Sequence, residues 1–249
     1  MSAANPVPDR AADTRRFYEL LSRVSERFGG YRHLATCDGR MDWPRRGVYF
    51  FFEPGEHRRD PACGLRVVRV GTHALKRGSR TSLWQRLSQH RGSSRSGAGN
   101  HRGSIFRLIV GVALARRADA TQPPSWGIGS DAGAAARKLG LDRTTVRRDE
   151  ADLERRVSEC IGQMPFLWLG VDDPPGPASM RGEIERNAIA LLSHARTPAV
   201  DAPSDRWLGA CSDREKVRVS GLWNNLHVTE AHAPSFLDVM ESLVNRRHE

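Results

Sequence analysis

A short aromatic run between breaking residues constrains the fold of this chain more than any other segment. Residues 47–53 read Gly-Val-Tyr-Phe-Phe-Phe-Glu, with Pro44 before them and Pro54-Gly55 after. Aromatic and β-branched residues favour strands, and a bounded apolar run this short is typical of a buried strand. The core therefore has to contain a sheet.

The segments that follow predict a mixture of strands and helices. Residues 65–70 and 164–171 are further apolar strand candidates, and residues 105–114 are predicted as a third strand after a Gly/Ser/Arg loop. Apolar residues at helical spacing predict helices, one beginning near Asp13 or Thr14 and carrying Phe17 to Phe28, and others at 82–90, about 149–162, about 180–195 and about 234–246. Together they indicate a compact α/β sandwich.

The net positive charge is concentrated in the first half of the chain. Residues 1–117 hold 23 Lys and Arg against 9 Asp and Glu, whereas residues 118–249 hold 16 against 20. Eight basic residues and no acidic one lie between Lys76 and Arg107, a pattern that favours a phosphate-lined partner. The alternative is a bias toward arginine, because Arg outnumbers Lys 36 to 3.

The four cysteines, Cys37, Cys63, Cys160 and Cys211, are scattered without a Cys-x-x-Cys pair. They indicate neither a zinc site nor a disulfide framework, and we expect them to be reduced. The N-terminus has no apolar leader and no run is long enough to cross a bilayer. We therefore expect a soluble, cytoplasmic protein without a membrane partner.

Arg86 and His90 form the first candidate site. They lie four residues apart on a predicted helix, on the side that also carries Leu83 and Leu87. An amphipathic helix normally keeps guanidinium groups on its wet face, so this placement suggests a polar pocket that opens on the sheet. Alternatively the arginine stem packs while its head reaches water, and the histidine marks a helix end.

Glu185 is the second candidate. On a helix it falls at the edge of the apolar stripe, beside Ile189 and Leu192, whereas Glu183 falls on the opposite side. A half-buried carboxylate is costly unless a cation or a metal pairs with it, and its oxygen ligands suit a largely hydrated Mg²⁺. A surface glutamate paired with a nearby arginine is the plainer alternative.

Three further features each have a structural alternative. Tyr49, in mid-strand, can be a plain core tyrosine, and Asn224 and Asn225 can cap a turn. Residues 134–148 resemble a helix-turn-helix, whose small residues and Leu-Gly turn precede Thr-Thr-Val-Arg-Arg. This pattern is common by chance, and an inserted loop and helix is the interpretation we favour.

Taken together, these motifs resemble the divided active site of the GIY-YIG nuclease superfamily. Gly47-Val48-Tyr49 is similar to its first motif and Arg69-Val70-Gly71 to its second. Arg86 and His90 are similar to its helix pair, and Glu185-Arg186-Asn187-Ala188-Ile189 to the metal-binding helix of its repair nucleases. Residues 99–107 look like those of the restriction-enzyme-like branch.

The resemblance implies a fold and a division of the chain. The fold would be α/β (α+β), with a small mixed, mainly antiparallel sheet sandwiched by helices. Residues 1–44 would form a tail and docking helix, 45–195 a nuclease core with an insertion at about 115–162, and 196–249 an extension that completes the site.

The resemblance also implies metal-assisted hydrolysis of DNA, double-stranded in the first instance, to 5′-phosphate and 3′-hydroxyl ends. Tyr49, activated by positive charge or by His90, would take a proton from the attacking water, and Arg86 would stabilise the pentacovalent phosphate. Glu185 would hold Mg²⁺, with Mn²⁺ as a substitute, and Asn224 would complete the site. A dimer is compatible with this mechanism.

One position departs from the family pattern. Arg69 stands where the second motif usually has tyrosine, so the second phenol is missing. This departure supports a competing hypothesis, a DNA-binding protein that keeps the fold but does not cleave. An RNA nuclease is a third hypothesis, because the positive charge suits either nucleic acid. The residues expected to contact nucleic acid are Lys76, Arg77, Arg91, Arg95, Asn100, His101 and Arg102.

Overall fold

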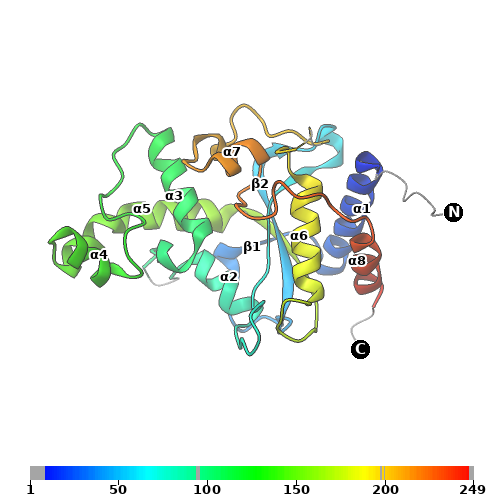
Figure 1. The fold of residues 1–249 in the computed structure, drawn as a ribbon, viewed down its shortest axis with the longest axis horizontal. Coiled ribbons are helices and arrows are strands. Elements are labelled where there is room, and N and C mark those ends of the chain that lie inside the picture. Colours follow the sequence, from blue (N-terminus) through cyan, green and yellow to red (C-terminus); the bar gives the residue numbers. More distant parts are fainter. Residues whose placement is uncertain (1–8, 94–95, 197, 199, 247–249) are drawn as a thin grey trace.

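The sheet at the centre of the fold has four strands in the order β1-β4-β2-β3 (Figure 1). The computed structural model describes residues 9–93, 96–196, 198 and 200–246. The strands are β1 (Arg32–His33), β2 (Gly47–His57), β3 (Leu65–Gly71) and β4 (Pro165–Gly170). Every neighbouring pair is antiparallel, so the predicted class, a helix-covered and mainly antiparallel sheet, is confirmed.

Helices cover both faces of this sheet (Figure 1). Val48 and Phe50 of β2 point into a core shared with α1 (Arg10–Phe28), α6 (Met180–Leu192) and α8 (Phe236–Asn245). Tyr49 and Phe51 point the other way, because side chains alternate along a strand. The remaining helices in the described part of the chain are α2 (Leu83–Arg91), α3 (Ile105–Arg117), α4 (Ala132–Leu139), α5 (Arg143–Gln163) and α7 (Glu215–Ser220), with short 3-10 turns at Leu34–Thr36, Pro61–Cys63, His101–Gly103 and Leu208–Cys211.

The strand predicted at residues 105–114 is wrong, because this segment forms α3. Ser104 caps the helix by accepting a hydrogen bond from the backbone N–H of Arg107. The helix is buried around most of its circumference, so its apolar run lacks the helical period that would have separated it from a buried strand. Gly111 lets Trp126 pack against the helix, since a Cβ there would lie 2.2 Å from the indole ring.

Helix α5 begins six residues earlier than the predicted start at 149, because Asp142 caps it. The preceding helix, α4, ends at Gly140 in the left-handed conformation with φ of 66°, and a small apolar cluster of Ala135, Ala136 and Val146 joins the two helices. Residues 134–148 thus fold as two helices joined by a tight turn, at the far left of Figure 1.

Strand β3 lies at the edge of the sheet, and a late segment of the chain covers that edge. A bulge opposite Phe51 and Phe52 leaves Val68 without a β2 partner. On its outer side, the Val68 carbonyl accepts a hydrogen bond of 2.7 Å from the N–H of Trp223. Segments 154 residues apart in sequence are therefore in direct contact where the site forms.

Candidate active site

Two glycines allow the strands of the site to approach closely. A Cβ on Gly47 would lie 2.5 Å from the carbonyl oxygen of Leu169 on β4. A Cβ on Gly71 would lie 2.4 Å from the phenol oxygen of Tyr49, which is paired with Gly71 across β2 and β3. Both positions need glycine because a neighbouring backbone or ring fills the space that a side chain would take.

Tyr49 and His90 form a buried hydrogen-bonded chain. The Tyr49 hydroxyl is 2.8 Å from Nε2 of His90, and Nδ1 of His90 is 2.7 Å from the hydroxyl of Ser104. The side chains of Tyr49 and His90 are both fully buried. Helix α2 points His90 at the sheet because His90 shares its inner face with Leu83 and Leu87.

The surroundings of His90 keep its imidazole neutral. Burial lowers the pKa of His90 well below 6.5, and the positive charges of Arg86, Arg69 and Arg107 lower it further. A neutral imidazole donates from one nitrogen and accepts at the other. His90 can therefore accept a proton from Tyr49 while Ser104 holds its second nitrogen.

Arg69 is buried among the other site residues. Its guanidinium donates to the carbonyl of Trp223 and lies 4.6 Å from the centre of the Phe106 ring. Burial lowers the pKa of Arg69, while the nearby Tyr49 and Glu185 oppose that shift. Thus the residue that replaces the motif tyrosine puts a buried cation between the phenol and the carboxylate.

Arg86 lies at the rim of the site on α2. Its guanidinium donates to Gln89 at 3.0 Å and to the carbonyl of Gly103 at 3.4 Å, and the side chain is partly exposed. It is one turn from His90, whose pKa its charge lowers. Arg86 can therefore reach both solvent and the buried chain.

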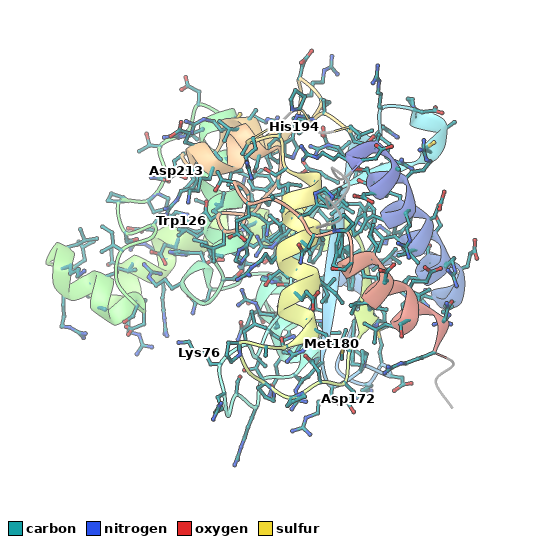
Figure 2. All side chains as sticks on the ribbon, turned by 45° about the vertical axis from the view of Figure 1, so that its right-hand side comes forward. Lys76, Trp126, Asp172, Met180, His194 and Asp213 are labelled. Carbon is teal, nitrogen blue, oxygen red and sulfur yellow. The ribbon has the colours of Figure 1, made fainter. Side chains whose placement is uncertain are left out.

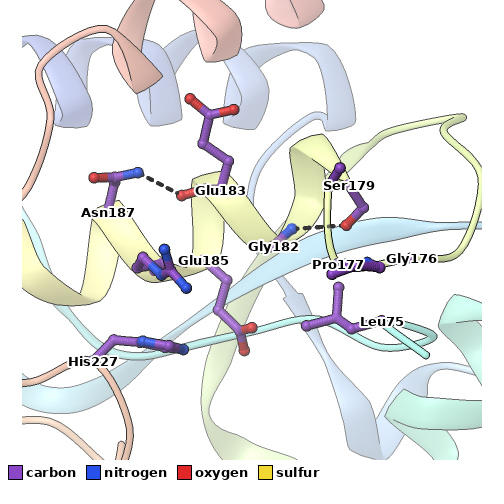
Figure 3. A pocket seen from close by; sticks show the side chains of 11 residues that line it. Leu75, Gly176, Pro177, Ser179, Gly182, Glu183, Glu185, Asn187 and His227 are labelled. Carbon is purple, nitrogen blue, oxygen red and sulfur yellow. Dashed lines mark hydrogen bonds between the residues drawn. The ribbon is translucent and has the colours of Figure 1, made fainter. Parts of the chain in front are cut away.

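Glu185 approaches the same strand from α6, on the other side of the sheet. Its Oε1 accepts a hydrogen bond of 3.1 Å from the N–H of Thr72, directly after β3. Burial raises the pKa of Glu185, and Arg69 is the first of several groups that oppose this shift. Its carboxylate enters a cavity of about 590 Å³ that Leu75, Ser179 and His227 also line (Figure 3).

Asn224 makes a structural contact in this arrangement. Its amide oxygen accepts from the N–H of Val70 at 3.2 Å, and its amide nitrogen donates to the carbonyl of Val70 at 2.8 Å. The side chain thus acts as a strand partner for the edge of β3. Asn225, the alternative candidate, is only partly buried.

The residues expected to contact nucleic acid divide into two groups. Lys76 and Arg77 are exposed on the loop after β3, close to the start of α6 (Figure 2), and Asn100 is exposed with its side chain capping a 3-10 turn. Arg91 is half-buried, stacks on Trp84 and donates to the carbonyl of Cys37. Arg95 lies outside the described residues.

His101 and Arg102 face inward. Nδ1 of His101 is 2.8 Å from Glu154, and its ring stacks on Trp126 at 3.8 Å. Arg102 makes two hydrogen bonds of 2.6 and 2.7 Å to Glu150. These two side chains anchor α5 and are not presented to a ligand, which corrects the expectation that they contact nucleic acid.

The carboxylates that hold this anchor were not predicted from the sequence. Glu150 and Glu154 are buried, and Glu154 also pairs with Arg107. Their spacing of four residues on one helix face was the available signal. Two further residues were not predicted either: Ser104, which holds His90, and His227, which faces Glu185.

Metal ligands are sparse in the site. In residues 9–93, 96–196, 198 and 200–246, no group of three or more His, Cys, Asp or Glu side chains could hold an ion. Glu183, Glu185 and His227 all line the cavity, but the side chain of Glu183 points away from the other two, so Glu185 and His227 are the donors directed at one another (Figure 3). Such a site suits an ion that keeps most of its water or takes oxygens from a substrate phosphate.

Comparison with known proteins agrees with this geometry. The family profile described as GIY-YIG domain matches residues 8–249, so the chain belongs to the GIY-YIG family. This is a nuclease family, whose members act on nucleic acid and generally use a divalent metal. No curated protein and no solved structure matches the chain significantly. No helix among the described residues is long and apolar enough to span a membrane.

Proposed function

We propose that this protein is a Mg²⁺-dependent endonuclease that cleaves double-stranded DNA to 5′-phosphate and 3′-hydroxyl ends, with Mn²⁺ as a substitute. The observation that carries the proposal is the 2.8 Å contact between Tyr49 and a neutral His90, close to Arg86 and Glu185. A plain core needs no such chain of polar groups, and their burial is costly without a function.

Each side chain has a role that its geometry permits. Tyr49 passes its hydroxyl proton to Nε2 of His90 and takes the proton of the attacking water in its place, while Ser104 fixes the ring. Arg86 stabilises the charge that develops on the phosphate, and it can do so because its guanidinium has no carboxylate partner among the described residues. Arg86 and Glu185 are partly exposed, so the substrate phosphate meets these two first.

Glu185 fits a metal ion. Its side chain is partly exposed, one carboxylate oxygen is held by Thr72, and the group points into a cavity with room for a hydrated cation. When bound there, Mg²⁺ supplies a Lewis acid that stabilises the leaving 3′-oxygen.

Arg69 supports activity in this proposal. Its buried guanidinium lies near both Tyr49 and Glu185, where it favours negative charge on either group. The function of the missing phenol is thus replaced by a fixed positive charge.

The exposed basic residues indicate how DNA is held. Lys76 and Arg77 lie on the loop beside the cavity, and we place the backbone of the DNA there. The α4–α5 pair carries a second exposed basic group, formed by Arg137, Lys138, Arg143, Arg147 and Arg148. These exposed cations suit a second contact with the phosphate backbone. We also propose that the chain is a member of the restriction-endonuclease-like branch, because residues 99–107 are similar to that branch. We propose separately that it acts in the cytoplasm.

The test is cleavage of supercoiled plasmid. We expect the full chain to nick or linearise the plasmid with Mg²⁺ or Mn²⁺ and to stop when EDTA is added. Glu185→Gln and Tyr49→Phe should each abolish cleavage while DNA binding persists. Glu183→Gln is the matched control, since Glu183 is an exposed carboxylate two residues away on the same helix.

A DNA-binding protein without cleavage is the second candidate. The complete burial of Tyr49, which keeps its hydroxyl away from solvent, favours it. Tight DNA binding with no cleavage in either metal would establish this candidate. Cleavage of RNA but not of DNA would instead show that the substrate is RNA.

A further inference from the structure

His227 reaches the active site through the segment that covers the edge of β3. Trp223 and Asn224 bond to Val68 and Val70 of that strand. The segment therefore advances along β3 toward its end, where the N–H of Thr72 holds Glu185. Three residues after Asn224, His227 lines the same cavity as Glu185, and its ring extends toward that carboxylate (Figure 3).

The backbone of His227 is held in an uncommon conformation. Its φ is +63°, in the left-handed region, which is unfavourable for a residue other than glycine. Strain of this kind persists only where surrounding contacts impose it, and it is concentrated at functional sites. Here the strain accompanies the turn that brings the imidazole into the cavity.

The hydrogen bond of the ring determines what its other nitrogen can do. Nδ1 of His227 is 2.7 Å from Oε1 of Glu230. An ionised carboxylate only accepts, so Nδ1 donates and a neutral ring carries its lone pair on Nε2. Glu230 is oriented in turn by Arg186, whose Nε lies 3.4 Å from it. A carboxylate that fixes one nitrogen while the other binds an ion is the usual arrangement of metal-binding histidines.

We propose that Nε2 of His227 and the carboxylate of Glu185 bind one divalent cation together, and that Glu230 positions the imidazole for it. This inference rests on the proposed function, which requires a metal at Glu185 only. Water and substrate phosphate oxygens occupy the remaining positions, for which the cavity of about 590 Å³ has room.

A nitrogen ligand has a consequence for the choice of metal. Imidazole suits first-row transition metals, whereas Mg²⁺ prefers an all-oxygen shell. The site should therefore bind Mn²⁺ and Co²⁺ more tightly than Mg²⁺, by a margin that depends on His227.

The test uses Mn²⁺ alone with the full-length protein and no DNA. Electron paramagnetic resonance titration gives the affinity, and pulsed measurements detect modulation from an imidazole nitrogen bound to the ion. We expect this modulation in the native protein and its loss in His227→Asn, because asparagine tolerates the left-handed backbone but has no imidazole. Glu230→Gln should keep the modulation and weaken Mn²⁺ binding by about 10- to 100-fold.

His33→Asn, which changes an exposed histidine on β1, is the matched control and should leave the affinity and the modulation unchanged. Mn²⁺ that binds in a manner dependent on Glu185 but shows no nitrogen modulation overturns the role of His227 and leaves the proposed function intact. Absence of Mn²⁺ binding overturns the shared site. Nitrogen modulation in a protein that cleaves no nucleic acid supports the metal site and contradicts the proposed function.

Discussion

Two pairs of arginines that look alike in the sequence have opposite surroundings in the fold. Arg102 and Arg107 are tied by short ion pairs to Glu150 and Glu154 of α5. Arg69 and Arg86 form no ion pair within the described part of the chain, although Arg69 is just as enclosed.

The difference teaches how to interpret a basic segment. A buried guanidinium with its own carboxylate is neutralised and holds the fold together. A guanidinium without one keeps its charge available for a phosphate. The structural arginines differ from the site arginines because Glu150 and Glu154, almost 50 residues later in the chain, pair with them. Nothing in the basic segment itself predicts the position of the helix that carries these two carboxylates.

Removing a structural arginine should have the largest effect. Arg107→Ala leaves the buried Glu154 with His101 but without its guanidinium partner, so we expect a loss of about 3–5 kcal/mol in the free energy of unfolding. Urea denaturation measures it. Arg155→Ala is the control, because Arg155 forms only exposed pairs on the same helix, and its change should stay below about 1 kcal/mol. Equal effects of the two substitutions would contradict the anchoring role of Arg107.

Removing an arginine of the site should affect activity alone. Arg86→Ala should lower kcat about 10²- to 10³-fold, because one donor to the developing charge is lost. Its midpoint of unfolding should change little, since its hydrogen bonds are at the rim. Single-turnover cleavage, with thermal unfolding of the same sample, checks both statements. A variant that loses activity only in proportion to its unfolded fraction would place Arg86 with the structural pair.

The charges that act on His90 should appear in the pH dependence of stability. The pKa of folded His90 is lowered by burial and by Arg86 and Arg69, whereas the unfolded residue has a pKa near 6.5. The stabilisation that comes from keeping His90 neutral is therefore fully present above pH 6.5. As the pH falls below 6.5 this stabilisation is lost, and the free energy of unfolding decreases by at most about 1.4 kcal/mol per pH unit. Urea denaturation between pH 5 and 7 measures this slope. His90→Gln should flatten it, and an unchanged slope in that variant would show that His90 does not cause it.

The smallest effect should come from the exposed cations. Lys76→Ala and Arg77→Ala should each weaken DNA binding a few-fold and reduce the salt slope of the affinity by about one. Fluorescence anisotropy at several salt concentrations measures this slope. Arg116→Ala, which changes an exposed arginine in the last turn of α3, is the control. A similar change in that variant would contradict the proposal that DNA lies at the β3 loop.

Much of the fold was predictable because local patterns carry it. The strands at residues 47–53 and 65–70 and the helix at residues 82–90 have strong local signals, and the structure agrees with them. Helix α3 was not predictable from its pattern, because a segment buried on nearly every side has no period. Within the site, Tyr49 and His90 are in direct contact, although no sequence pattern gives the distance between them.

The rest of the site depends on contacts between distant segments. Glu185 is placed by one hydrogen bond to Thr72, and Asn224 by two to Val70. The nearest sequence neighbours of His227 contain no motif, and only the path of the chain along β3 brings it to the cavity. Such tertiary effects cannot be read from spacing.

The covering of β3 by residues near the end of the chain affects when the site can be completed. The partner of Val70 lies 154 residues further on, and synthesis at about 5–20 residues per second separates the two by on the order of ten seconds. Throughout that interval Val70 lacks its partner Asn224, and the cavity beside Glu185 lacks His227. If the proposed function holds, a growing chain therefore carries an incomplete site until its last residues are made.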